Sequence, residues 1–180
     1  IEPRLFSFNN PAGACSDCGG LGFEIQYSPS LIVPDETKTI RRGAIAPWSR
    51  DDVITQNAYL LESVCKHYNI SMDKQWNKLT EKEQEIILYG NSGENIKVDW
   101  NGWIVTKPFE GVIPNLERRW KETESDWQRA EIEKYQQYIP CKKCNGKRLN
   151  NKALCIKIDG FDIIDITKLN IQEAYDWFNN

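Results

Sequence analysis

Apolar positions along the chain repeat with a period of two in some stretches and of three to four in others, which predicts a mixture of strands and helices. Alternation over residues 5–8 and 22–27 predicts two strands. All but one of the helical segments carry capping signals at or near their starts. The predicted helices are 51–68, 80–90, 112–121, 125–138 and 170–178. The expected caps are Asp51 or Asp52 for the first, Thr80 with Glu83 for the second, Ser125 with Gln128 for the fourth and Asn170 with Glu173 for the last. Gly90 is expected to end the second helix, and Pro140 the fourth.

Two hairpins are indicated by turn residues that separate alternating runs. Asn101-Gly102 joins residues 95–100 to 103–106, and both residue types accept the positive φ of a type I′ turn. Asp159-Gly160 joins residues 154–158 to 161–164 in the same way. Residues 31–47 are interrupted by proline and glycine, so we expect extended pieces and turns there.

Two cysteine pairs add a candidate metal site. Each pair has the C-x-x-C spacing that lets two thiolates face one ion, and glycines follow each pair where the turn needs positive φ. The predicted ligands of one closed, structural Zn²⁺ per chain are Cys15, Cys18, Cys141 and Cys144. The long separation departs from compact zinc patterns, and a dithiol or disulfide within each pair is the alternative. Six cysteines in 180 residues are too few for a disulfide scaffold.

This pairing of distant cysteines sets the predicted organisation. Residues 1–25 and 140–180 form a zinc-stapled base, and residues 26–139 form an α+β insertion. The fold class is therefore α+β, with mixed hairpins and helices inserted into a four-cysteine base. Cys65 and Cys155 are interpreted as small core residues, and His67, the single histidine, as a structural residue.

Composition is that of an ordinary globular protein, with 40% hydrophobic and 27% charged residues. No apolar run approaches the ~20 residues of a membrane span, so we expect a cytoplasmic protein without membrane contact. A net charge of −3 argues against a uniformly basic nucleic-acid surface. One strip is locally basic without any acid, and it either offsets the thiolate cluster or contacts phosphate: Lys142, Lys143, Lys147, Arg148, Lys152 and Lys157.

Basic residues interleaved with tryptophan give candidate DNA contacts, because guanidinium groups suit phosphate and indole rings can stack on bases. Acidic neighbours such as Glu117 and Glu122 dilute the second group, where a solvated helix with i,i+4 ion pairs is the alternative. The candidates are Arg41, Arg42 and Arg50 near Trp48, and Arg118, Arg119 and Lys121 near Trp120. A structural or protein-interaction module that docks partner subunits without touching DNA is the competing function. A DnaJ-type cysteine-rich domain fits less well, because its C-x-x-C-x-G-x-G motif occurs in full only once.

Five stretches in order resemble the UvrA family, the damage-sensing ATPase subunit of the bacterial excinuclease ABC. They are residues 2–9, 15–22, 109–112, 117–119 with 121–125, and 141–149. The resemblance implies that the chain comes from the N-terminal half of such a subunit. In that family an insertion domain interrupts the zinc module of an ATP-binding-cassette signature domain. The resemblance further implies that the insertion domain flanks the DNA channel. It implies damaged double-stranded DNA, UvrB and a second copy of the full-length protein as partners, and ATP as a ligand of that protein.

The chain departs from a complete ATPase. It contains no G-x-x-x-x-G-K-[ST] loop, no L-S-G-G signature and no Walker B Asp-Glu pair. We therefore expect no catalytic residue and no enzymatic activity in this stretch alone, and a start without methionine agrees with a fragment. The expected function is a DNA-contacting insertion domain, on a zinc module, of the damage-recognition subunit in nucleotide excision repair.

Overall fold

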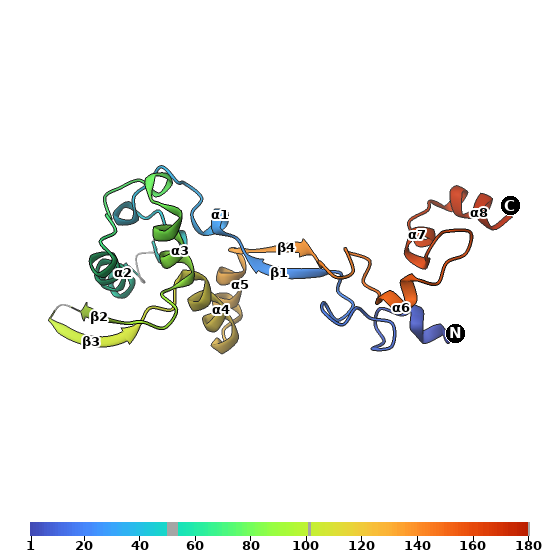
Figure 1. The fold of residues 1–180 in the computed structure, drawn as a ribbon, viewed down its shortest axis with the longest axis horizontal. Coiled ribbons are helices and arrows are strands. Elements are labelled where there is room, and N and C mark those ends of the chain that lie inside the picture. The colour runs from blue at the N-terminus through green and yellow to red at the C-terminus, as the bar shows by residue number, and fades with distance from the viewer. Residues whose placement is uncertain (50–53, 101, 180) are drawn as a thin grey trace. The chain divides into compact units, whose positions relative to one another are not determined.

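The computed structural model describes residues 1–49, 54–100 and 102–179. The chain divides into two compact units. Residues Tyr27–Gln137 form the central unit, and Ile1–Gln26 with Tyr138–Asn180 form what we call the cysteine unit. The strands β1 (Phe23–Tyr27) and β4 (Gln136–Pro140) pair in a two-stranded sheet where the chain passes out of and back into the cysteine unit (Figure 1).

The central unit packs helices against one hairpin. Strands β2 (Asn95–Trp100) and β3 (Trp103–Pro108) are antiparallel, with Val98 opposite Val105. Buried and exposed residues alternate along β2: Val98 is buried and the preceding Lys97 is exposed. This alternation is expected for a sheet with one covered face. The helices are α1 (Pro29–Ile32), α2 (Ile54–Tyr68), α3 (Glu81–Tyr89), α4 (Val112–Glu122) and α5 (Asp126–Glu133), with 3₁₀ turns η2 (Ile40–Arg42), η3 (Ala46–Trp48) and η4 (Trp76–Lys78).

The core of the central unit is made of aliphatic and aromatic side chains from nearly every element. Removing this apolar surface from water stabilises the fold by ~25 cal/mol for each Å². Its most deeply buried members are Ile32, Ile45, Val64, Ile87, Ile96, Val98, Phe109, Val112 and Leu116.

Helix caps in the central unit confirm two sequence predictions. The Thr80 hydroxyl accepts from the Glu83 N–H, and the Glu83 carboxylate accepts from the Thr80 N–H, so α3 begins with a reciprocal capping box. The Ser125 hydroxyl caps α5 by accepting from the Gln128 N–H. Helix α3 ends at Tyr89, and the predicted stop Gly90 is its C-cap, with a φ of 88°.

The cysteine unit is poor in regular structure. Its elements are η1 (Pro3–Phe6), α6 (Asn151–Leu154), α7 (Ile163–Thr167) and α8 (Ile171–Asn179). Helix α8 is capped as predicted, since Asn170 and Glu173 exchange hydrogen bonds. None of the helices in the described part of the chain is both long and apolar enough to cross a membrane.

Three predicted elements are wrong. Residues 5–8 are not a strand, because Pro3 opens a 3₁₀ turn there. The helix predicted over 125–138 ends at Glu133, and the following segment pairs with β1 as β4. The hairpin of 154–164 is reduced to a bridge between Ile158 and Phe161, because helices α6 and α7 occupy its ends.

One further expectation is partly correct, and others cannot be compared with the structure. Residues 31–47 contain short helical turns as well as extended pieces. The caps expected at Asp51 or Asp52, the candidate Arg50 and the turn residue Asn101 lie outside the described residues.

Candidate metal centre and nucleic-acid interface

Four cysteines from the two ends of the chain meet in one buried cluster. The Sγ atoms of Cys15 and Cys141 are 4.0 Å apart, and those of Cys18 and Cys144 are 3.7 Å apart. All four lie within 4.8 Å of one another. Four sulfurs bound tetrahedrally at ~2.3 Å from zinc are about 3.8 Å apart, so the spacing fits that ion.

The cluster is not a pair of disulfides. All six cysteines are free thiols. The two sulfur contacts of 4.0 and 3.7 Å join opposite pairs, and both are far longer than a disulfide bond of ~2.05 Å. The alternative of a disulfide inside each pair is therefore not what the structure contains.

Tight turns behind each cysteine pair aim the sulfurs inward. Gly19 and Gly20 follow the first pair with φ of 60° and 86°, and Asn145 and Gly146 follow the second with φ of 53° and 82°. A Cβ at Gly20 would lie 2.0 Å from the Phe8 carbonyl oxygen. The need for glycine after the first pair is thus steric as well as conformational.

Electrostatics within the cluster favour a cation. Burial acts to raise the pKa of the Cys18 thiol, but hydrogen bonds from the Gly22 and Gly20 backbone N–H groups lower it to about 7. Burial and the neighbouring sulfurs raise the pKa of Cys144 to about 12. The Cys18 thiol therefore ionises readily, whereas ionisation of the remaining thiols is opposed. A divalent cation among the four sulfurs would remove this opposition, because it stabilises thiolates.

Part of the basic strip is occupied by contacts around this cluster. Lys143 Nζ binds Asp17 Oδ1 at 2.7 Å, which links the two cysteine turns. Arg148 donates from Nε to the Gly20 carbonyl at 2.8 Å, and its guanidinium lies 3.4 Å from the centre of the Phe8 ring. These two cations therefore hold the first turn against the second.

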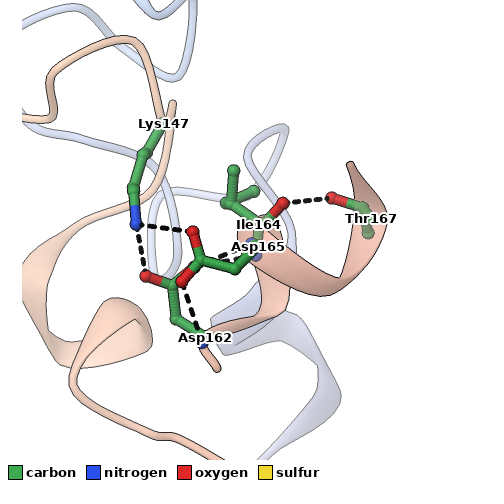
Figure 2. A network of polar contacts seen from close by, with 5 residues as sticks. All are labelled: Lys147, Asp162, Ile164, Asp165 and Thr167. Carbon is green, nitrogen blue, oxygen red and sulfur yellow. Dashed lines mark hydrogen bonds and ion pairs between the residues drawn. The ribbon is translucent and has the colours of Figure 1, made fainter. Parts of the chain in front are cut away.

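Lys147, three residues after Cys144, connects the cluster turn to α7 (Figure 2). Its Nζ lies 2.5 Å from Asp162 Oδ2 and 3.1 Å from Asp165 Oδ1. Asp162 is buried and caps α7 by accepting from the Ile164 and Asp165 N–H groups. Burial opposes ionisation of Asp162, but Lys147 and the backbone donors lower its pKa below the ordinary value.

The other cysteines and the histidine are placed away from the cluster. Cys65 is buried in the central core, as predicted, and burial raises its pKa to about 12. Cys155 is exposed at the end of α6, so its interpretation as a core residue is wrong. His67 Nε2 contacts Glu94 Oε1 at 3.2 Å on the surface.

The candidate DNA contacts fall in two places on the central unit. Arg41 and Arg42 are exposed on η2, and Arg41 Nε pairs with Asp73 Oδ1 at 2.9 Å. This acidic partner lies 32 positions further along the chain, so local sequence did not reveal it.

Arg118, Arg119 and Lys121 lie on α4. The Arg118 guanidinium is engaged by Glu110 at 2.8 Å and by Glu122 at 2.8 Å. Both carboxylates raise the pKa of Arg118, and Arg118 lowers that of Glu110. Arg119 is half-buried and Lys121 is exposed, and neither forms an ion pair with a described residue.

The fold and the cluster define an α+β module in which the sequence of the central unit lies between the two halves of a four-cysteine cluster that could hold a metal ion. Residues 29–134, nearly the whole central unit, match the family model of the UvrA DNA-binding domain. The chain belongs to the UvrA family.

Curated relatives and a solved structure agree with this assignment. UvrABC system protein A of Brucella abortus biovar 1 (strain 9-941) is 47% identical over 184 residues, which are 100% of this chain and 19% of that protein. The same protein of Bradyrhizobium diazoefficiens is 42% identical over 185 residues, 99% of this chain and 18% of that protein. The crystal structure of UvrA2 from Deinococcus radiodurans matches with a TM-score of 0.73 at 25% identity, over 98% of this chain and 23% of that chain. The chain thus spans about a fifth of the length of these curated relatives.

Proposed function

We propose that the central unit contacts DNA for a UvrA-type damage-recognition subunit in nucleotide excision repair. The observation that carries this proposal is the match of residues 29–134 to a family model described as a DNA-binding domain. Exposed cations on η2 and α4 supply groups that can contact phosphate.

The cysteine cluster would hold one structural Zn²⁺ in this function. Cys15, Cys18, Cys141 and Cys144 supply four thiolates at distances that suit the ion. Bound zinc would neutralise part of the thiolate charge and fix the two turns in place. Four sulfur ligands leave no open coordination position, so the role is structural.

The wider assignments concern the longer protein. Residues 1–25 and 140–180 are proposed as the zinc-stapled part of an ATP-binding-cassette signature domain, and 26–139 as its insertion domain. ATP binding and hydrolysis, a homodimer, UvrB as partner and a cytoplasmic location are assigned to that protein. This chain lacks the phosphate-loop sequence, so ATP chemistry is assigned to other parts.

Binding of the 180-residue chain to duplex DNA, measured over a salt series with damaged and undamaged DNA, tests the proposal. A net-acidic chain offers few phosphate contacts, so we expect weak, sequence-independent binding. The expected slope of log K against log salt has a magnitude of roughly 2 to 4, at about 0.9 for each phosphate. Absence of resolvable binding at low salt would favour a structural or protein-interaction module instead.

A further inference from the structure

A cleft of about 440 Å³ opens on the central unit beside the η2 turn. Its size lies in the range of about 300–1,000 Å³ that is typical of small-ligand sites. The 3₁₀ turns η2 and η3 and helix α2 contribute to its wall, and Met72 contributes from the following loop. Part of the wall is apolar, from Ile40, Ile45, Ala58, Leu61 and Met72.

The remaining wall is cationic. Lys38, Arg41 and Arg42 line the cleft together with one carboxylate, that of Glu62. Lys38 and Arg42 form no ion pair with another described residue. Arg41 is held by Asp73 through Nε alone, so its two terminal nitrogens make no hydrogen bond within the described part of the chain. Three cations around an apolar wall fit an anion with a non-polar portion.

A buried donor in the same wall lacks an acceptor. Trp48 lines the cleft and is 5% exposed, yet its Nε1 has no hydrogen-bond partner among the described residues. A buried indole N–H without an acceptor destabilises the fold and calls for an explanation. An oxyanion in the cleft would supply the missing acceptor.

The loop that carries this donor is held by its own contacts. The Ser49 hydroxyl shares its one proton between the carbonyl oxygens of Ile45 at 2.6 Å and Gly43 at 3.1 Å. Gly43 has a φ of 77°, and a Cβ there would lie 2.9 Å from Ser49 Oγ. The turn from η2 to η3 is therefore fixed before any ligand arrives, which lowers the entropic cost of binding.

We propose that this cleft binds a phosphate oxyanion, with Lys38, Arg41 and Arg42 neutralising its charge and Trp48 Nε1 donating a hydrogen bond. The source to which we commit is a backbone phosphate of DNA, with the attached sugar against the apolar wall. This inference rests on the proposed DNA-binding function and assigns its phosphate contact to one place. A free phosphate ion or a nucleotide carries the same oxyanion, and the experiment below distinguishes these ligands from DNA.

Indole N–H resonances of the ¹⁵N-labelled 180-residue chain provide the test. The Trp48 resonance is identified by its loss in Trp48→Phe and then followed during titration with a short DNA duplex, with inorganic phosphate and with a deoxynucleoside monophosphate. We expect the duplex to shift the Trp48 resonance at lower concentration than the two small ligands do. Losing one hydrogen bond to a charged acceptor should make Trp48→Phe bind the duplex about tenfold more weakly.

Matched variants make the result specific. Trp100 Nε1 is also buried without a described partner, but Trp100 lies on β2 and does not line the cleft, so Trp100→Phe should bind like the parent chain. Arg42→Ala should weaken binding and lower the salt slope by about one unit. It alters an exposed residue, so it tests the cleft even if Trp48→Phe fails to fold.

Each outcome is decisive. DNA binding that leaves Trp48 unmoved and ignores Arg42→Ala would overturn the cleft while the proposed function stood. A Trp48 shift with small phosphates but no DNA binding would overturn the DNA function and give the cleft a nucleotide or phosphate ligand. No response to any probe would overturn both.

Discussion

Gly90 and Gly111 approach each other so closely that neither position has room for a side chain. A Cβ on Gly111 would lie 2.3 Å from the Gly90 nitrogen, and a Cβ on Gly90 would lie 2.4 Å from the Glu110 carbonyl oxygen. Gly90 ends α3, and Gly111 precedes α4. The contact between these helices in the central core therefore depends on two glycines 21 positions apart.

Gly111→Ala should lower the free energy of unfolding by about 2–4 kcal/mol, because it adds a backbone clash to an unfavourable φ. Gly93→Ala is the control: its φ of 90° equals that of Gly111, but open space surrounds it. The control should lose only about 1 kcal/mol. Denaturant unfolding of both variants measures the difference, and equal losses would show that the close approach is unimportant.

Cys18→Ser and Cys141→Ser should each abolish tight binding of zinc, because a structural site needs all four thiolates. Elemental analysis should give one zinc per parent chain and much less in either variant, with a lower unfolding temperature. Cys155→Ser changes an exposed cysteine outside the cluster and should keep the ion. Zinc retained in Cys18→Ser would contradict the assignment.

Lys147→Met should destabilise the cysteine unit by about 1–3 kcal/mol, because it leaves the buried Asp162 carboxylate without its cation. Lys143→Met breaks an exposed pair with Asp17 and should have a much smaller effect. Thermal unfolding and hydrogen exchange of the α7 amides compare the two. Similar losses would mean that burial of Asp162 does not matter.

The Lys147 effect should also depend on pH. The pKa of Asp162 is lowered in the folded chain, so its contribution is present above the unfolded value of ~3.9 and is lost as pH falls through the folded value. Hydrogen bonds to Asp162 and Asp165 raise the pKa of Lys147, so its contribution is present below ~10.4 and is lost as pH rises through the folded value. The difference between parent and Lys147→Met should therefore be constant near neutral pH and shrink below pH ~4, as unfolding curves would reveal.

Arg118→Ala should leave the salt slope of DNA binding unchanged, because Glu110 and Glu122 already engage its guanidinium. Arg119→Ala and Lys121→Ala remove cations that have no described ion-pair partner, so any phosphate contact made from α4 should be lost with them. Fluorescence anisotropy over a salt series separates the three variants. A lower slope for Arg118→Ala alone would place the α4 contact at Arg118.

The sequence predicted correctly those elements whose hydrogen bonds join residues that are close together along the chain. The capping box of Thr80 with Glu83 and the hairpin of β2 and β3 depend on residues close in sequence. The cysteine cluster was predictable despite its separation, because few arrangements other than a shared metal explain two such turns.

Errors arose where distant partners decide the structure. Residues 136–140 fit a helical pattern, but pairing with β1 more than 100 positions away makes them a strand. The error at 154–158 has a local cause instead, because α6 occupies the start of this run and ends at Leu154, with Asn150 capping it by accepting from the Ala153 N–H. That capping signal was present in the sequence.

Charged partners could not be read from the sequence either. Arg41 has no acid close to it along the chain, yet Asp73 binds it. Lys147 was grouped with a basic strip, yet two carboxylates of α7 engage it. Ion pairs of this kind need the fold, because separation in sequence carries no distance information.

The cysteines that face each other across the cluster are 126 positions apart in the chain. For a flexible loop, each doubling of length adds only ~0.6 kcal/mol to the entropy of closure. The cost of closing the cysteine unit therefore changes little with the number of residues it encloses. A change in the length of the enclosed segment should therefore cost little at its anchoring cysteines, so this segment can be lengthened, trimmed or exchanged while its attachment is kept.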